Sequence, residues 1–216
     1  MDFEQARFNM IEQQIRPWDV LDQDVLDALR IVKREAFVAP ERQALAFSDI
    51  ELPIGGGQSM LAPKIEARAL QALAVRPGDN ILEIGAGSGH MAALLASRGA
   101  WVRSIEIDPQ LVSLAAKNLD RSGVDNVIVE EGDGLAGWAS AAPYDVIMVS
   151  GAVLEIPQVL LDQLRPDGRL FAFVGSAPVQ QGVLVQCRGE GQFERYGVFE
   201  TLVTPLRSAQ VESFSF

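Results

Sequence analysis

The sequence predicts an α/β fold built on a doubly wound, mostly parallel sheet with helices on both faces. Between residues 63 and 174, short apolar runs with strand character alternate with segments of helical periodicity, which is typical of parallel sheets with crossover helices. One predicted strand, 81–84, runs into a loop with glycine at 85, 87 and 89, and a helix follows from Met91. A turn of this kind is typical of Rossmann-like sheets that bind nucleotide-like cofactors.

The composition favours a folded protein with an acidic surface. Hydrophobic residues make up 48% and charged residues 22% of the 216 positions, and 18 basic against 29 acidic residues give a net charge of -11. A nucleic-acid-binding surface usually needs a basic face, so we expect no nucleic-acid partner. No apolar run is long enough to span a bilayer, and the first residues lack a secretion signal. Because Cys187 is the only cysteine, it cannot form an internal disulfide, and we expect a cytoplasmic location.

The first part of the chain is predicted to be helical. Apolar residues at helical spacing predict a helix over 2–15, which Pro17 ends. Asp22 has the position of an N-cap for a second helix. The elements that follow are a break at 38–40, a short helix around 41–46, an extended segment at 50–54, a loop at 55–62, a helix that begins at Pro63, and a turn at 76–79.

Beyond the glycine-rich loop the alternation of helices and strands is regular. The predicted elements are a helix at 91–98, a strand at 101–107, a helix from Pro109 to Arg121, strands at 126–130 and 142–150, a helix at 157–164, a turn at 165–169 and a strand at 170–174. The tail 182–206 has strand character only, which predicts an antiparallel edge. Since no linker or repeat interrupts the chain, we expect a single domain over 1–216. Residues 1–62 would form an N-terminal cap and loop, and 63–216 the sheet and the C-terminal strands.

Two acidic residues accompany the glycines and indicate the kind of cofactor. Glu83 lies inside an apolar strand, where an unpaired carboxylate is costly, so we expect a cationic or hydrogen-bonding partner for it. Glu106 ends the next strand, about 20 residues after the glycines, where a ribose-binding acid belongs. An acid just before the glycines disfavours a diphosphate and suits a ligand with an ammonium group. S-adenosylmethionine has an ammonium group, a sulfonium group and a ribose, so we expect this cofactor and methyl transfer.

Several short stretches narrow the prediction further. They are Gln13-Gln14-Ile15-Arg16, Leu52-Pro53-Ile54-Gly55, Gly57-Gln58-Ser59, Ala62-Pro63, Pro77-Gly78-Asp79, Leu82–Gly89, Gly132-Asp133-Gly134, Ala142–Asp145 and Leu164–Leu170. With them the chain resembles the protein-L-isoaspartate O-methyltransferase family over nearly its whole length. Most of the later stretches recur in methyltransferases generally, whereas the Gly57–Ser59 loop and the N-terminal part are specific to this family.

The resemblance implies a repair enzyme that uses S-adenosylmethionine to methylate the abnormal carboxylate of isoaspartyl residues in damaged proteins. It implies that Glu83 and the three glycines hold the methionine end of the cofactor, that Glu106 binds the ribose, and that Asp133 and Gly134 border the adenine. The loop 57–61 would cover cofactor and substrate, with Ser59 and position 61 closest to the chemistry. The expected cofactor-binding residues are Gln58, Ser59, Glu83, Gly85, Ala86, Gly87, Ser88, Gly89, Glu106, Ile107, Gly132, Asp133 and Gly134.

The substrate half departs from the family pattern. Leu61 stands where the family has a hydroxyl residue, Lys64 where it commonly has histidine, and Val153-Leu154 where it usually has an alanine-rich run with proline. Three hypotheses therefore stay open: an isoaspartyl methyltransferase, a diverged methyltransferase with another acceptor, and a non-catalytic protein that binds the cofactor or a partner. The sequence does not predict an oligomeric state.

The expected reaction agrees with a site that is poor in acid–base groups. A carboxylate has a pKa of about 4, so its attack on a sulfonium methyl needs alignment and desolvation more than a general base. His90 is the only histidine, and we expect it to cap or pack against a helix rather than to act in catalysis. Asp133 and Ser59 could likewise serve only local turns. No Cys/His cluster is present in the sequence, and no metal site is expected.

Overall fold

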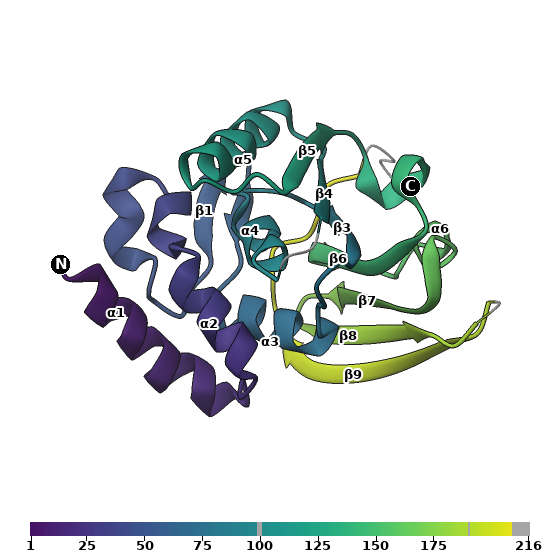
Figure 1. The fold of residues 1–216 in the computed structure, drawn as a ribbon, viewed down its shortest axis with the longest axis horizontal. Coiled ribbons are helices and arrows are strands. Elements are labelled where there is room, and N and C mark those ends of the chain that lie inside the picture. Colours follow the sequence, from purple (N-terminus) through teal and green to yellow (C-terminus); the bar gives the residue numbers. More distant parts are fainter. Residues whose placement is uncertain (99–100, 190, 209–216) are drawn as a thin grey trace.

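The computed structural model describes residues 1–98, 101–189 and 191–208, and a seven-stranded sheet runs through it (Figure 1). The strand order is β5-β4-β3-β6-β7-β8-β9. The parallel strands are β3 (Asn80–Ile84), β4 (Trp101–Glu106), β5 (Val127–Glu131), β6 (Tyr144–Val153) and β7 (Leu164–Ser176). The antiparallel strands β8 (Val179–Cys187) and β9 (Phe193–Thr201) continue the sheet to its edge. The predicted mostly parallel sheet with an antiparallel edge is confirmed.

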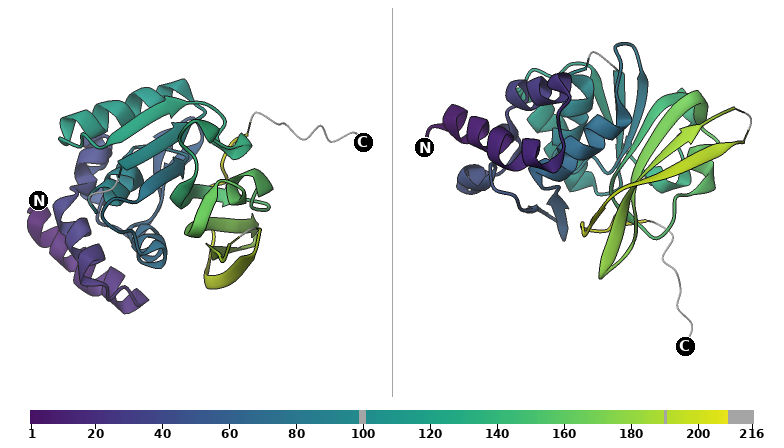
Figure 2. Two further views of the ribbon diagram at one scale, coloured as in Figure 1. Left: turned by 45° about the vertical axis from the view of Figure 1, so that its right-hand side comes forward. Right: turned by 90° about the horizontal axis from the view of Figure 1, so that it is seen from below.

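Helices cover both faces of the sheet, but unequally (Figures 1 and 2). Side chains alternate along a strand, so Ile81 enters one apolar core and Leu82 the other. The first core contains residues of α1 (Phe3–Met10), α2 (Gln23–Ile31), α3 (Pro63–Leu73), α4 (His90–Ala96) and α5 (Pro109–Arg121). The second core is closed by α6 (Gln158–Leu161), with the short 3-10 helices η5 (Gly134–Ala136) and η6 (Ala139–Ala141) nearby.

The N-terminal part is helical, as predicted, but the continuous helical path runs beyond the predicted end at residue 15, to Trp18. Helix α1 begins after Asp2, whose carboxylate accepts from the backbone N–H of Glu4 at 3.0 Å. It continues through a π-helix, η1 (Ile11–Ile15), and a 3-10 helix, η2 (Arg16–Trp18). Pro17 therefore lies inside a helical turn, because proline is tolerated in the first turn of a short helix, and the helical path ends at Asp19 (φ 58°).

The capping role of Asp22 is confirmed, and two elements after α2 differ from the prediction. Asp22 accepts from the backbone N–H of Asp24 at 2.9 Å. The second helix is predicted to run to the break at 38–40, but α2 ends at Ile31 and a separate 3-10 helix, η3 (Arg34–Phe37), follows. The next helical segment is η4 (Pro40–Leu45). The predicted loop 55–62 is partly a strand, because β1 (Leu52–Gly55) and β2 (Gln58–Met60) form an antiparallel hairpin. Its turn contains glycines with positive φ, which allow the reversal.

Three later boundaries also differ from the prediction. Helix α6 is shorter than the predicted 157–164. The predicted turn 165–169 lies within β7 as a bulge, because Tyr144 pairs with Leu164 whereas Val146 pairs with Arg169. In the predicted strand region 182–206, the last strand, β9, ends at Thr201, and only an isolated bridge between Pro205 and Ala152 follows. The C-terminal segment, residues 202–208, returns to β6, where Leu206 N donates to Ala152 O at 2.9 Å.

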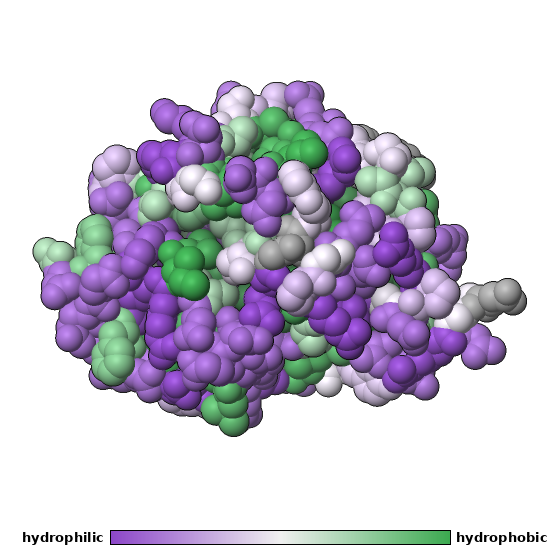
Figure 3. Space-filling model, viewed as in Figure 1, coloured by the Kyte–Doolittle hydropathy of each residue, from purple (hydrophilic) through white to green (hydrophobic). Residues whose placement is uncertain are grey.

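The described surface is largely polar. The face drawn in Figure 3 is mostly hydrophilic, with separate small hydrophobic groups. Across residues 1–98, 101–189 and 191–208, no helix has both the length and the apolar character that crossing a membrane would require. Cys187 is buried on β8.

Candidate active site

The glycine-rich loop, residues 85–89, joins the end of β3 to α4 and is approached closely by three other segments. A Cβ atom on Gly85 would lie 2.7 Å from Leu206 Cδ2, and one on Gly87 would lie 3.0 Å from Ile54 Cδ1. At Gly89 an added Cβ would lie 3.2 Å from the carbonyl oxygen of Ala115 on α5. All three glycines have positive φ, so both the backbone conformation and the close contacts favour glycine here.

The main cavity lies at the carboxyl ends of β3, β4, β5 and β6, next to this loop. In an open parallel sheet, ligands bind in such a crevice where the strand order reverses, and here β4 and β6 flank β3 on opposite sides. The predicted site residues that line the main cavity are Gln58, Ser59, Gly85, Gly87, Glu106, Ile107, Gly132, Asp133 and Gly134. The sheet therefore brings together residues that are up to 76 positions apart in the sequence, from Gln58 to Gly134.

The other predicted residues lie close to this cavity. A second space, the inner hollow, is lined by Ser59, Leu61, Ala86 and Ser88, together with Glu66, Ser150 and others. Glu83 and Gly89 line neither space. Gly89 packs against α5, and Glu83 is completely buried beneath the loop.

Glu106 ends β4 and holds the backbone on two sides. Its Oε2 accepts from the N–H of Gly87 at 2.9 Å, and its Oε1 accepts from the N–H of Asp108 at 3.0 Å. An ionised carboxylate has about four acceptor positions. After these two bonds, Glu106 can still accept hydrogen bonds from hydroxyl groups in the main cavity that it lines.

Glu83 has the hydrogen-bonding partners that the sequence predicted, and both are hydroxyl groups. Ser104 Oγ, directly opposite on β4, donates at 2.5 Å, and Ser150 Oγ at the end of β6 donates at 2.8 Å. Burial raises the pKa of Glu83 to about 8, although the two hydroxyl groups act in the opposite direction. Ser150 also lines both cavities. The only signal for these serines in the sequence is a small polar residue in an apolar strand.

Asp133 both caps a turn and lines the main cavity, so its capping contact leaves it in the candidate site. Its Oδ1 accepts from the N–H of Leu135 at 3.1 Å, and its Oδ2 accepts from Ser208 Oγ at 3.0 Å. The neighbouring glycines allow close packing, because a Cβ on Gly134 would lie 2.8 Å from Ile84 Cγ2. Trp138 packs in the same way on Gly132.

The C-terminal segment forms one wall of the main cavity, which sequence reasoning missed. Leu206 and Arg207 line it, Gln58 Nε2 donates to Pro205 O at 3.3 Å, and Arg207 pairs with Asp108 at 2.9 Å. The enclosed space is about 40 Å³, whereas ligand sites usually measure roughly 300–1,000 Å³. A nucleotide-sized ligand therefore needs more space than the lining residues leave in this conformation.

A larger groove of about 850 Å³ shares Leu135 and Leu206 with the main cavity. Residues 153–155, 175–177 and 202–206 line it, so the departing pair Val153-Leu154 belongs to its wall. The other departure, Lys64, is turned toward the N-terminal part. Its ammonium group pairs with Asp49 at 2.6 Å and lies 4.0 Å from the centre of the Trp18 ring.

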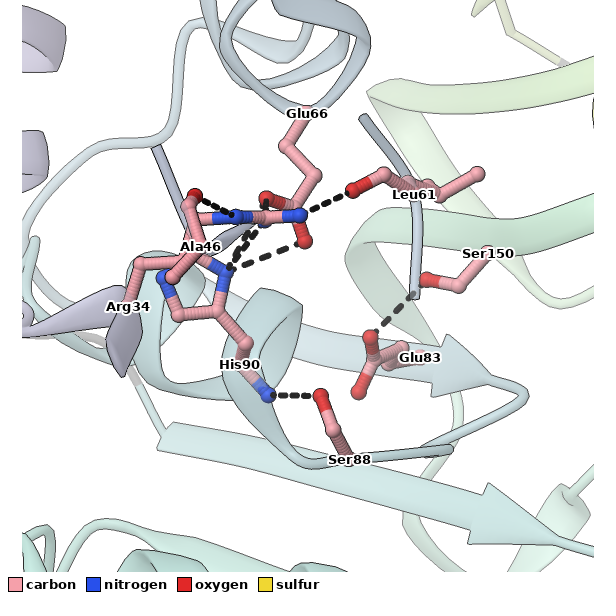
Figure 4. A network of polar contacts seen from close by, with 8 residues as sticks. All are labelled: Arg34, Ala46, Leu61, Glu66, Glu83, Ser88, His90 and Ser150. Atoms are coloured by element: carbon pink, nitrogen blue, oxygen red, sulfur yellow. Dashed lines mark hydrogen bonds and ion pairs between the residues drawn. The ribbon is translucent and has the colours of Figure 1, made fainter. Parts of the chain in front are cut away.

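His90 is buried and has an acidic partner, which the sequence did not predict (Figure 4). Its Nδ1 lies 3.0 Å from each carboxylate oxygen of Glu66. Glu66 also pairs with Arg34, which in turn donates to the carbonyl oxygen of Leu61 at 2.6 Å. Leu61 is 4% exposed and its side chain lines the inner hollow.

A glycine-rich loop after the central strand, an acid at the end of the next strand and a cavity at the strand ends form a site for a nucleotide-like cofactor. The match to a family model identifies the class as the S-adenosylmethionine-dependent methyltransferases. The model of the family described as protein-L-isoaspartate(D-aspartate) O-methyltransferase matches residues 5–210. The chain belongs to this family.

Known relatives agree with this assignment over most of the chain. A protein-L-isoaspartate O-methyltransferase of Gloeobacter violaceus is 41% identical over 197 residues, which cover 91% of this chain and 96% of that protein. One from Methylorubrum extorquens is 44% identical over 193 residues, covering 89% and 84%. The fold is also that of a Plasmodium falciparum protein solved with S-adenosyl-L-homocysteine, with a TM-score of 0.80 at 18% identity over 96% of this chain and 99% of that one.

The raised pKa of Glu83 predicts a pH-dependent stability. Between its ordinary value of 4.5 and about 8, the unfolded chain releases a proton that the folded protein keeps, so the free energy of unfolding falls as the pH rises. Glu83→Gln should remove this loss and stabilise the cofactor-free protein at pH 8 by on the order of 3 kcal/mol. At pH 5 the difference should be small. Chemical denaturation at several pH values measures it, and parallel curves for the two proteins would contradict the assignment.

Proposed function

We propose that the protein transfers a methyl group from S-adenosylmethionine to the carboxylate of isoaspartyl residues in damaged proteins and peptides. Family membership supports this proposal. The observation that carries it is that Ser59 of the hairpin borders both the main cavity and the inner hollow, directly beside the glycine-rich loop. The cofactor supplies a methyl group activated by its sulfonium charge. The residues of the chain then have to bind, orient and desolvate.

The proposed cofactor contacts follow the lining of the main cavity. Glu106 holds the ribose hydroxyls, and Asp133 with Gly134 borders the adenine. The backbone of residues 85–88 holds the methionine end, and Glu83 acts on that end through Ser150, which lines both cavities. Gln58 and Ser59 cover the cofactor from the hairpin side. In this arrangement backbone N–H groups lie beside the expected carboxylate of the cofactor, and the Glu106 carboxylate lies beside the expected ribose hydroxyls.

The acceptor side is formed by the acceptor loop, residues 57–61, and by the adjoining groove. The groove shares Leu206 with the main cavity and is lined by residues 202–206, which suits an extended peptide that carries its carboxylate toward the loop. In the described part of the chain, no histidine, lysine or cysteine lines the inner hollow or the groove. The carboxylates there are Glu51 and Glu155 in the groove and Glu66 in the inner hollow, which is already paired with Arg34 and His90. Alignment and exclusion of water are therefore the proposed means of catalysis.

A methyl-transfer assay with radiolabelled S-adenosylmethionine tests the proposal. An isoaspartyl peptide is compared with the same sequence containing ordinary aspartate, and binding of S-adenosyl-L-homocysteine is measured in parallel by calorimetry. We expect methyl ester on the isoaspartyl peptide alone. Cofactor binding without transfer to either peptide would reject the isoaspartyl acceptor, and absence of both binding and transfer would reject a methyltransferase altogether.

The ribose assignment predicts a selective loss of affinity. Glu106→Ala should weaken cofactor binding by on the order of 1.5–3 kcal/mol per lost hydrogen bond, because the acceptor is charged. Glu131→Ala is the matched control. Glu131 lies opposite Glu106 in the register of β4 and β5, at the end of the neighbouring strand, but does not line the main cavity. Titration calorimetry should find its affinity unchanged. A folded Glu106→Ala protein that binds as tightly as the wild type would remove the assignment.

Leu61 favours a second candidate function, transfer to a more apolar acceptor, because its buried side chain lines the inner hollow and cannot donate a hydrogen bond. If the acceptor is an isoaspartyl carboxylate, Leu61→Ser should lower the activation free energy of transfer by up to ~1.5 kcal/mol, which raises the rate about tenfold. Leu61→Ala is the control for the lost side-chain volume. A rise with serine but not with alanine supports the carboxylate acceptor, whereas equal losses in both variants would favour the apolar one.

A further inference from the structure

Arg34, Glu66 and His90 form a buried polar network beside the acceptor loop (Figure 4). Each residue is at most 2% exposed, and the three come from η3, the first turn of α3 and the first position of α4. Glu66 Oε2 accepts from Arg34 Nη1, and both oxygens of Glu66 lie 3.0 Å from His90 Nδ1. Buried charges persist when they are paired and hydrogen-bonded in this way.

The guanidinium of Arg34 holds the backbone at two further points. Its Nε donates to Ala46 O at 2.9 Å, and its Nη2 donates to Leu61 O at 2.6 Å. In Figure 4 the guanidinium lies between these two carbonyl groups. Because Leu61 is the last residue of the acceptor loop, Arg34 determines where that loop meets the inner hollow.

Arg34 and Glu66 supply one positive and one negative charge, and the Nδ1 atom of His90 lies within hydrogen-bonding distance of both Glu66 oxygens. With Nδ1 donating to Glu66, Nε2 is left buried without a hydrogen-bond partner in the described part of the chain. The ring packs edge-on against Phe37, with 5.2 Å between the ring centres.

His90 links the network to the cofactor side of the site. It follows Gly89 directly, and its backbone N–H donates to Ser88 Oγ at 3.3 Å. Ser88 and Leu61 both line the inner hollow. The network therefore connects the two sides of this space, the end of the glycine-rich loop and the end of the acceptor loop.

We propose that Arg34 is a positioning residue for methyl transfer, supported by Glu66 and His90. By holding the carbonyl group of Leu61, it keeps the acceptor loop at a fixed distance from the glycine-rich loop, so that acceptor and methyl group meet in line. This inference rests on the proposed methyl-transfer function. Since alignment supplies much of the rate in such a reaction, a displaced loop slows transfer while cofactor binding persists.

Arg169 provides a matched control for a merely structural role. It is 7% exposed, its Nε donates to Leu73 O at 2.8 Å, and its Nη2 donates to Ala74 O at 2.9 Å and to Asp79 at 2.8 Å. Like Arg34, it joins a carboxylate to two backbone carbonyl groups. Asp79 precedes β3, however, so Arg169 acts at the end of the sheet opposite to the glycine-rich loop.

The test compares Arg34→Lys with Arg169→Lys, because lysine keeps the charge but lacks the planar fork of donors. Single-turnover transfer to an isoaspartyl peptide at saturating cofactor should slow by about tenfold in Arg34→Lys and stay within about twofold in Arg169→Lys. Affinity for S-adenosyl-L-homocysteine should stay within about twofold in both, although both melt at lower temperature. Amide hydrogen exchange over residues 58–62 should quicken by about tenfold in Arg34→Lys only.

Two results would overturn the proposal. Equal transfer rates in Arg34→Lys and Arg169→Lys would show that Arg34 has only a structural role. A loss of cofactor affinity in Arg34→Lys as large as its loss of transfer rate would show that Arg34 acts on cofactor binding and not on the acceptor loop. A wild-type protein that does not methylate the peptide would refute the proposed function instead. In that case the positioning role of Arg34 is tested by the amide hydrogen exchange of residues 58–62 alone. Unchanged exchange in Arg34→Lys would reject that role.

The part played by His90 can be tested with two conservative variants. Asparagine places an N–H donor near the position of Nδ1, whereas glutamine places it one bond further out. His90→Asn should keep transfer within about threefold of the wild type, and His90→Gln should fall to the rate of Arg34→Lys. Equal rates for the two variants would remove His90 from the network.

Discussion

Three segments pack directly onto the backbone of the glycine-rich loop, and this close approach is the constraint on which the rest of the site depends. Leu206 comes from the C-terminal segment, Ile54 from the hairpin and Ala115 from α5. A Cβ atom at Gly85 or Gly87 would meet the end of the Leu206 or Ile54 side chain, and one at Gly89 would meet the backbone of α5. The loop therefore sets the position of the acceptor side and of the C-terminal wall at the same time as it forms the cofactor side.

The chemistry that fits this arrangement asks for geometry more than for acid–base groups. Glu106 holds the glycine-rich loop through the N–H of Gly87, and Glu83 is held beneath the loop by two serine hydroxyls. On the other side, the carbonyl group of Leu61 is held by Arg34. Each side is thus fixed by buried polar contacts, as an alignment mechanism requires. A carboxylate acceptor would bring its own nucleophile to such a site.

The parts of the structure that sequence reasoning predicted are those encoded locally. The strand, glycines and helix at 81–96 are adjacent in the chain, and the bounds of α5 and the cap of α2 follow from Pro109 and Asp22. The parts that it missed depend on contacts between distant segments. Arg34 and Glu66 are 32 positions apart, and Ser150 is 67 positions from Glu83. Such pairs leave no periodic pattern, and a buried arginine or serine resembles a surface residue in the sequence. The wall formed by Leu206 was missed for the same reason.

The pH dependence of the chemical step tests the central claim, that the site aligns a carboxylate acceptor and supplies no general base. Single-turnover methyl transfer to an isoaspartyl peptide would be measured from pH 4.5 to 9 with cofactor saturating at every pH. The account predicts a rate that rises only near the pKa of the acceptor, about 4, and is then level to pH 9. Two results together would contradict the account: a wild-type rate that keeps rising between pH 6 and 8, and the absence of this rise in a His90→Gln protein with normal cofactor affinity.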